Sequence, residues 1–241
     1  MERETRRENP WLNIGFNMVV PSLLLIKGRR LFELAGVAPS YIDAAVLAVA
    51  LAFPIVYGIW DLARRRKFNI FSIIGVLSVV LTGGIGLLKM SREWIILKEG
   101  LVPLVLGAAV LATAATRRPL ARIIMLNGDI VDLPKIESAL DSRGTSGRFD
   151  AALRRATFWV AGSFLLSSVL NFALASYIFT AGASAEEFNA QVGRMTALSF
   201  PVIALPTMVV LFYAMYRLFS EMGECTGLSL EESLRGKAEK K

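Results

Sequence analysis

The sequence predicts an all-α integral membrane protein, a bundle of about six transmembrane helices with both termini in the cytoplasm. Three observations predict it. Hydrophobic residues make up 54% of the 241 residues, the mean hydropathy is +0.53, and most Lys and Arg residues fall on alternate loops. A helix needs about 20 mainly apolar residues to cross roughly 30 Å of hydrocarbon, because it rises about 1.5 Å per residue.

Six apolar segments meet this length requirement. They lie at 11–26, 41–60, 68–88, 95–116, 157–179 and 195–218. The first is the weakest, since it is short and carries Asn13 and Asn17. Several spans contain prolines, which free carbonyls that can kink a helix or line a cavity. They are Pro21, Pro54, Pro103, Pro201 and Pro206. We expect one polytopic membrane domain over 1–241.

Charge sets the orientation of the six spans. With an even number of spans, both termini share a side with the second-to-third loop and with the long fourth-to-fifth loop at 117–156. That side carries 20 of the 27 Lys and Arg residues, and the opposite side carries 7. The positive-inside rule therefore places both termini in the cytoplasm. This topology also explains the net charge of +7 without a nucleic-acid partner.

Polar side chains repeat at helical spacing on two spans. Asn13, Asn17 and Pro21 share one face of the first, and Asn171 shares a face of the fifth with Ser163 and Ser167. Membrane helices associate through small and polar residues, so these faces should point into the bundle. Two interpretations stay open. The amides satisfy one another or a backbone carbonyl, or they line a polar groove for a solute or a lipid headgroup.

The residue inventory argues against an enzyme. The chain has no histidine, which removes the usual general base, imidazole metal ligands and His-bearing triads. Its single cysteine, Cys225, cannot form a thiolate cluster. The acidic residues of the 117–156 loop match no calcium-loop pattern. We therefore expect no catalytic residue, cofactor or metal.

The stretch "TGGIGLLKMSREWIILKEG", residues 82–100, resembles a phosphate-binding loop only superficially. A Walker motif has Gly-Lys-Ser/Thr opening a helix after a strand, whereas these glycines close an apolar helix. We expect Gly83, Gly84 and Gly86 to let the third span end against a neighbour. Glu93 and Lys98 should start or flank the fourth span, and Lys89 can pair with Glu93 if the turn is helical.

The same stretch carries a family resemblance. "GGIGLL" followed by an acid, a lysine and an apolar run, then "RRPLARIIM", "LP" and "LNFALASYIF", resembles the intracellular septation protein A (YciB-like) family. The resemblance runs from the third span to the sixth. The matching positions are Gly83, Gly84, Glu93, Lys98, Pro119, Leu120, Pro134 and Asn171. The chain departs from the family in its longer polar N-terminus, fourth-to-fifth connection and C-terminal tail, so it can belong to a related branch.

The resemblance implies a bacterial inner-membrane protein linked to septation and envelope maintenance. Such a protein would act without catalysis, through membrane lipids and division or envelope proteins. The alternative function is a small solute or lipid transporter, in which Asn13, Asn17 and Asn171 line a polar groove between helices. The sequence leaves the oligomeric state open.

Overall fold

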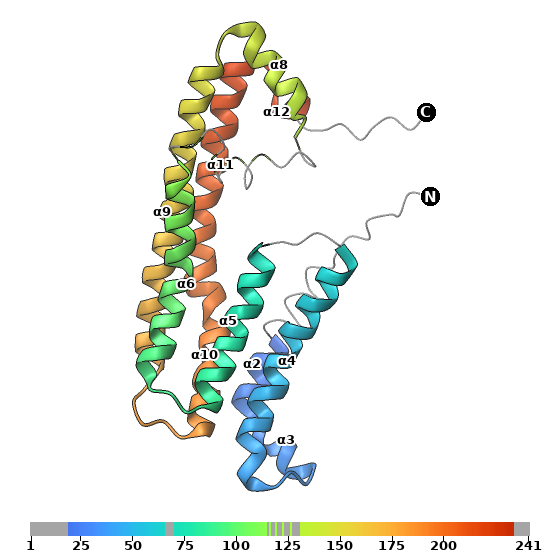
Figure 1. Ribbon diagram of the computed structural model, residues 1–241, viewed down its shortest axis with the longest axis vertical. Coiled ribbons are helices and arrows are strands. Elements are labelled where there is room, and N and C mark those ends of the chain that lie inside the picture. The colour runs from blue at the N-terminus through green and yellow to red at the C-terminus, as the bar shows by residue number, and fades with distance from the viewer. Residues whose placement is uncertain are drawn as a thin grey trace, which may run out of the picture. The chain divides into compact units, whose positions relative to one another are not determined.

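The computed structural model describes residues 19–65, 70–114, 116, 119, 122, 126 and 131–233, and its architecture is all-α (Figure 1). The chain divides into two compact units. Unit 1 comprises Met1–Gly100 and Leu170–Ile203, and unit 2 comprises Leu101–Val169 and Ala204–Lys241. Asn13 and Asn17 lie outside the described residues.

Four helices are long and apolar enough to cross a membrane, which indicates a multi-pass membrane protein. They are Pro39–Trp60, Arg92–Ala112, Ser146–Ile178 and Ala185–Thr226. They coincide with the second, fourth, fifth and sixth expected spans. The third expected span corresponds to an 18-residue apolar helix, Ile70–Leu87. Large apolar side chains such as Val105, Val169 and Val209 are exposed along the long helices, as expected for surfaces that face lipid.

Among the described residues, unit 1 contains five complete helices and parts of three further helical elements. They are α2 (Val20–Lys27), α3 (Arg29–Leu34), α4 (Pro39–Arg65), α5 (Ile70–Leu87), the start of α6 (Arg92–Ala112), the end of α9 (Ser146–Ile178), α10 (Ala185–Ser199) and most of η2 (Phe200–Ala204). Its core includes Leu25, Leu47, Ile95, Ala175 and Val192.

Two glycines show how closely the helices of unit 1 approach one another. A Cβ on Gly193 of α10 would lie 2.8 Å from Ile26 Cγ1 and 3.0 Å from the Ser22 carbonyl oxygen, both on α2. A Cβ on Gly83 of α5 would lie 3.0 Å from Leu51 Cδ1 of α4. The absence of a side chain at these two positions therefore lets α2 pack closely on α10 and α4 on α5, around the space described below.

The sixth helical segment is longer than the span 195–218. α10 begins at Ala185 with a capping box, in which the Ser184 hydroxyl accepts from the Glu187 backbone N–H and the Glu187 carboxylate accepts from the Ser184 N–H. The helix then passes through the π-helix η2 into α11 (Leu205–Thr226). Pro201 and Pro206 have no N–H to donate, so the normal ladder is interrupted there.

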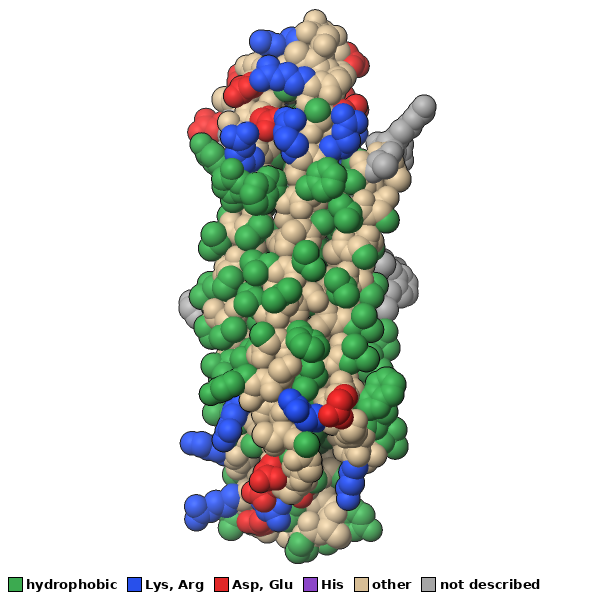
Figure 2. Space-filling model, turned by 90° about the vertical axis from the view of Figure 1, so that its left-hand side faces the viewer, with side chains coloured by type: hydrophobic (Ala, Val, Ile, Leu, Met, Phe, Trp, Pro, Cys, Tyr) green, Lys and Arg blue, Asp and Glu red, His purple; other side chains and the backbone are tan. Residues whose placement is uncertain are grey.

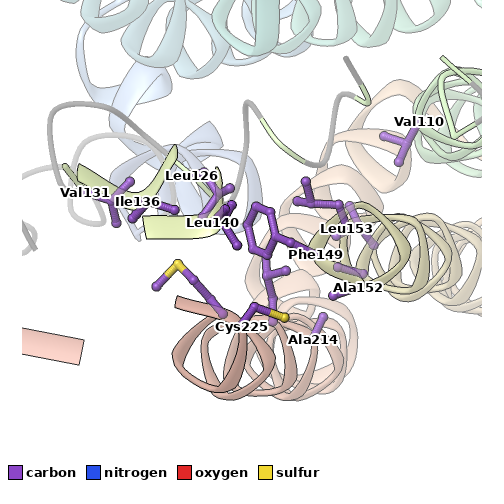
Figure 3. Close-up of a cluster of buried hydrophobic side chains, with 14 of the residues drawn as sticks. Val110, Leu126, Val131, Ile136, Leu140, Phe149, Ala152, Leu153, Ala214 and Cys225 are labelled. Atoms are coloured by element: carbon purple, nitrogen blue, oxygen red, sulfur yellow. The ribbon is translucent and has the colours of Figure 1, made fainter. Parts of the chain in front are cut away.

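Unit 2 contains the rest of α6, α8 (Leu133–Arg143), most of α9, α11 and α12 (Leu230–Ser233). Figure 3 shows side chains of α8, α9 and α11 pointing toward one another, with Phe149 beside Leu140. α8 is capped at its start by Asp132, whose carboxylate accepts from the Lys135 N–H, and at its end by Gly144, whose φ is 67°. The segment expected to be a cytoplasmic loop is therefore packed from residue 131 onward.

Charged side chains gather at the end of unit 2 that carries α8, next to hydrophobic side chains (Figure 2). Three ion pairs hold elements together there: Arg122 with Glu137, Arg148 with Glu224 and Arg155 with Glu221. These pairs connect α8 to the chain before it and α9 to α11.

Candidate functional site

A cavity of about 260 Å³ with one polar wall lies in unit 1. Its walls come from α2, α4, α5, α6 and α10. Prolines on α2 and α4 contribute to the apolar part, and the polar part is formed by six side chains. These are Ser78, Thr82, Lys98, Glu99, Thr196 and Ser199. Because the cavity carries a charged pair and four hydroxyls between apolar helices, it is the candidate functional site.

Lys98 is the centre of the polar wall. It is the seventh residue of α6, about 9 Å along the axis from Arg92, and only 9% exposed. Its Nζ donates to Thr82 Oγ1 at 2.7 Å and lies 3.3 Å from Ser78 Oγ, both on α5. A lysine near a helix end usually extends toward the interface. Here the ammonium group points into the helix packing instead.

Glu99 is the charge partner of Lys98. Its Oε1 lies 2.6 Å from Lys98 Nζ, and its side chain is 20% exposed. An unpaired charge at this depth would be costly, so ionisable side chains inside membrane segments pair with one another. With Thr82 and Ser78, Glu99 occupies all three donors of the Lys98 ammonium group.

Three hydroxyl groups of the cavity wall can accept hydrogen bonds. Thr82 donates to the Ser78 carbonyl at 3.0 Å, Thr196 to the Val192 carbonyl at 2.9 Å and Ser199 to the Met195 carbonyl at 2.6 Å. Each of these hydroxyl hydrogens is therefore donated within its own helix, while lone pairs of the oxygen can still accept hydrogen bonds. The second oxygen of the Glu99 carboxylate adds further acceptor capacity.

A proline adds a backbone acceptor near this wall. Pro54 lies inside α4 and lines the cavity. It has no N–H, so it cannot donate to the carbonyl of Ala50 one turn earlier. Such carbonyls are tolerated within a membrane helix where a neighbour or a cavity can satisfy them. The described lining thus offers more hydrogen-bond acceptors than free donors.

The structure separates the residues that the sequence grouped together. Lys98 lines the cavity, whereas Glu93 is exposed in the first turn of α6. Gly83 is buried against α4, but a Cβ on Gly84 meets no described atom within 4 Å. Asn171 is half-buried on α9 outside the cavity lining. Pro119 is buried and belongs to unit 2.

The turn before α6 is not helical. Lys89 has a φ of 50°, α5 ends at Leu87 and α6 begins at Arg92. Because no helix carries both residues, the condition for a helical Lys89–Glu93 pair is not met. The acid that pairs in this region is Glu99, with Lys98.

Sequence reasoning missed five polar residues of the cavity. Ser78 and Thr82 are four apart on α5, a spacing that places both on one helix face. Glu99 directly follows the nominated Lys98. Thr196 and Ser199 are three apart near the start of the sixth expected span. Among the described residues, no group of three or more His, Cys, Asp or Glu side chains is placed to hold a metal ion.

Comparison of the chain with protein-family models, curated proteins and solved structures finds no match. The resemblance to septation proteins therefore stays a prediction that rests on the quoted motifs.

Proposed function

We propose that this chain is a non-enzymatic, multi-pass membrane protein that binds and moves a small hydrogen-bond-donating ligand, a polar solute or a lipid headgroup, in the Lys98 cavity. The Lys98–Glu99 pair, which lies between the apolar stretches 94–97 and 101–112 of α6, carries the proposal. Ionisable residues within membrane helices are expensive to keep, and they commonly mark ligand or ion pathways.

The size and chemistry of the cavity define the ligand class. Its 260 Å³ falls below the roughly 300–1,000 Å³ of pockets for drug-sized molecules, so the ligand is small. The Lys98 donors are occupied, while Thr196, Ser199 and Glu99 offer acceptors. A primary ammonium group, such as that of ethanolamine free or as a lipid headgroup, has the matching donors.

The proposed topology has six spans with both termini in the cytoplasm of a bacterium, in its inner membrane. The apolar run 11–26 continues into α2, and α5 covers most of the third expected span. In this topology the turn before α6 faces away from the cytoplasm, and Lys98 lies near that side. Pro54 and the π-helix η2 supply interrupted hydrogen-bond ladders at which helices can adjust during transport.

A ligand pair of equal charge, of which only one member has N–H donors, tests the proposal. Ethanolamine and choline carry the same charge, but choline has no N–H group. We expect ethanolamine to raise the melting temperature of the protein in nanodiscs more than choline does, because a ligand at 100 times its Kd stabilises by about 2.7 kcal/mol. Nanodiscs of phosphatidylethanolamine and phosphatidylcholine then distinguish a lipid headgroup from a free amine.

The matched variant is Thr196→Val with Ser199→Ala. Both side chains line the cavity and donate to carbonyls of their own helix, α10. The double substitution therefore removes acceptors from the cavity and keeps Lys98 and Glu99. The difference between ethanolamine and choline should disappear in this variant. Equal responses to the two ligands in the unsubstituted protein would reject the ligand class.

A second candidate function is septation and envelope maintenance through protein partners, as the family resemblance implies. The folded end of unit 2 favours it, because Thr145 donates to the Cys225 carbonyl at 2.8 Å and Arg148 pairs with exposed Glu224. A fixed charged surface suits protein recognition better than a loose loop does. Cross-linking in native bacterial membranes should recover division or envelope proteins, and recovery of none would reject this candidate.

A further inference from the structure

A second, smaller cavity lies between α9 and α11 in unit 2. Its volume is about 170 Å³. Two arginines, an acid and two aromatic side chains form its distinctive part: Arg155, Trp159, Tyr213, Arg217 and Glu221. Alanines of both helices form the floor, so the cavity is a groove between closely packed helices. It shares no residue with the Lys98 cavity.

The groove has an excess of positive charge. Glu221 pairs with Arg155 across the groove and lies 3.4 Å from Arg217 on its own helix. The Glu221 side chain is 16% exposed, whereas each arginine side chain is 55% exposed. Each guanidinium carries five N–H donors, and one carboxylate cannot occupy them all. Glu221 thus orients two arginines whose remaining donors suit an anion with several oxygens, such as a phosphate.

The aromatic residues indicate where the groove lies relative to a bilayer. Trp159 is four residues after Arg155, and Tyr213 is four residues before Arg217, so the aromatic pair lies about 6 Å along the helices from the arginines. The two rings pack edge to face at 4.9 Å and are both exposed. Farther from the arginines, Leu165 on α9 and Val209 on α11 are exposed apolar residues. Trp and Tyr concentrate at the headgroup level of membranes.

We propose that this groove binds the headgroup phosphate of an anionic phospholipid. Arg155 and Arg217 contact the phosphate, and the acyl chains lie along the exposed apolar faces of α9 and α11. Basic pockets at the cytoplasmic ends of membrane helices suit anionic headgroups, and the positive-inside topology places this end in the cytoplasm. A zwitterionic lipid fits less well, because its ammonium group would face two guanidinium groups.

Native mass spectrometry of lipid adducts tests the site in the purified full-length protein. We expect more binding of phosphatidylglycerol than of phosphatidylcholine. The variant Arg155→Gln/Arg217→Gln should weaken the phosphatidylglycerol affinity about thirtyfold, since each basic residue near the surface contributes roughly a fivefold effect. Circular dichroism verifies that the variant is folded.

The matched control is Arg148→Gln/Arg154→Gln, which removes the same charge from α9 but leaves the groove intact. It should lower the affinity less than about threefold, because only diffuse attraction is lost. Equal losses in both variants, or equal binding of the two lipids, would overturn the proposal. Competition by millimolar inorganic phosphate as effective as competition by lipid would assign the groove to a free anion instead. Lys98 variants should leave this binding unchanged, which separates it from the proposed function.

Discussion

Lys98 Nζ donates a hydrogen bond to Thr82 Oγ1 over 2.7 Å, which joins α6 to α5 inside unit 1. Thr82 can accept it because its own hydrogen is directed to the Ser78 carbonyl. Thr82→Val keeps the shape and leaves one ammonium donor without its partner. We expect a loss of about 2 kcal/mol in the free energy of unfolding, measured by denaturant unfolding in mixed micelles.

Thr196→Val is the control for Thr82→Val, because Thr196 lines the same cavity and bonds to the Val192 carbonyl of its own helix. It should change stability by less than about 0.5 kcal/mol. If the two valine variants are equally stable, the Lys98–Thr82 hydrogen bond contributes nothing to the free energy of unfolding.

Replacement of Glu99 tests the ion pair. Glu99→Gln keeps the volume but removes the negative charge 2.6 Å from Lys98 Nζ. We expect the unfolding free energy to fall by about 2–3 kcal/mol, less than for a fully buried pair because water reaches Glu99 in part. The double variant Glu99→Gln/Lys98→Met should recover part of the loss, since an apolar replacement of both partners leaves no unpaired charge.

Glu93→Gln provides the comparison for Glu99→Gln. Glu93 has the same side chain on the same helix, but it is exposed at the first turn of α6. Its replacement should cost less than about 1 kcal/mol, the contribution of an exposed acid at a helix N-terminus. A larger effect at Glu93 than at Glu99 would shift the functional assignment back to the residue that the family motif nominated.

The sequence predicted the helices well because their signals are local. Apolar length located the four long spans. α8 has local signals as well, since Pro134 lies in its first turn and Asp132 and Gly144 supply the caps. The start of α10 was missed, although Ser184 and Glu187 form a capping box. In a membrane protein a polar segment between two apolar runs is easily interpreted as a loop, even when it continues a helix.

The cavity was only partly predictable because it depends on tertiary packing. Lys98 was nominated, but from a motif, and its direction is set by Thr82 and Ser78 on another helix. The choice between Glu93 and Glu99 depends on which face of α6 meets α5. Hydropathy gives the position of a helix in the chain but leaves its rotation undetermined.

Two glycines of unit 1 can be compared: Gly193 lies in close helix packing, whereas Gly84 belongs to the family motif. Gly193→Ala would place a Cβ 2.8 Å from Ile26 Cγ1 and 3.0 Å from the Ser22 carbonyl oxygen. Because a backbone atom cannot move aside easily, α2 and α10 must separate. We expect a loss of about 1–3 kcal/mol, measured by thermal unfolding in nanodiscs.

Gly84→Ala is the counterpart of Gly193→Ala in an open position of α5. A Cβ there meets no described atom within 4 Å, and alanine favours a helix by up to about 1 kcal/mol over glycine. Stability should therefore stay equal or rise. A marked loss would mean that the motif glycine has a contact outside the described residues or a functional role.

The last prediction concerns the helix C-terminus at Gly227 in unit 2. Gly227 and Gly144 both end helices in the left-handed conformation, with φ of 72° and 67°. Alanine at either position costs about 1 kcal/mol from the backbone alone. At Gly227 the new Cβ also meets the Arg143 guanidinium, with Cζ 2.9 Å away, whereas at Gly144 no described atom lies within 4 Å.

Gly227→Ala should therefore be more destabilising than Gly144→Ala by roughly 1 kcal/mol, because the Arg143 side chain has to move out of its position. In the background Arg143→Ala the two glycine substitutions should cost the same, since only the backbone term remains. Denaturant unfolding of all variants in one micelle composition gives the comparison. If Gly227→Ala remains more destabilising than Gly144→Ala in the Arg143→Ala background, the extra loss of stability comes from the end of α11 itself.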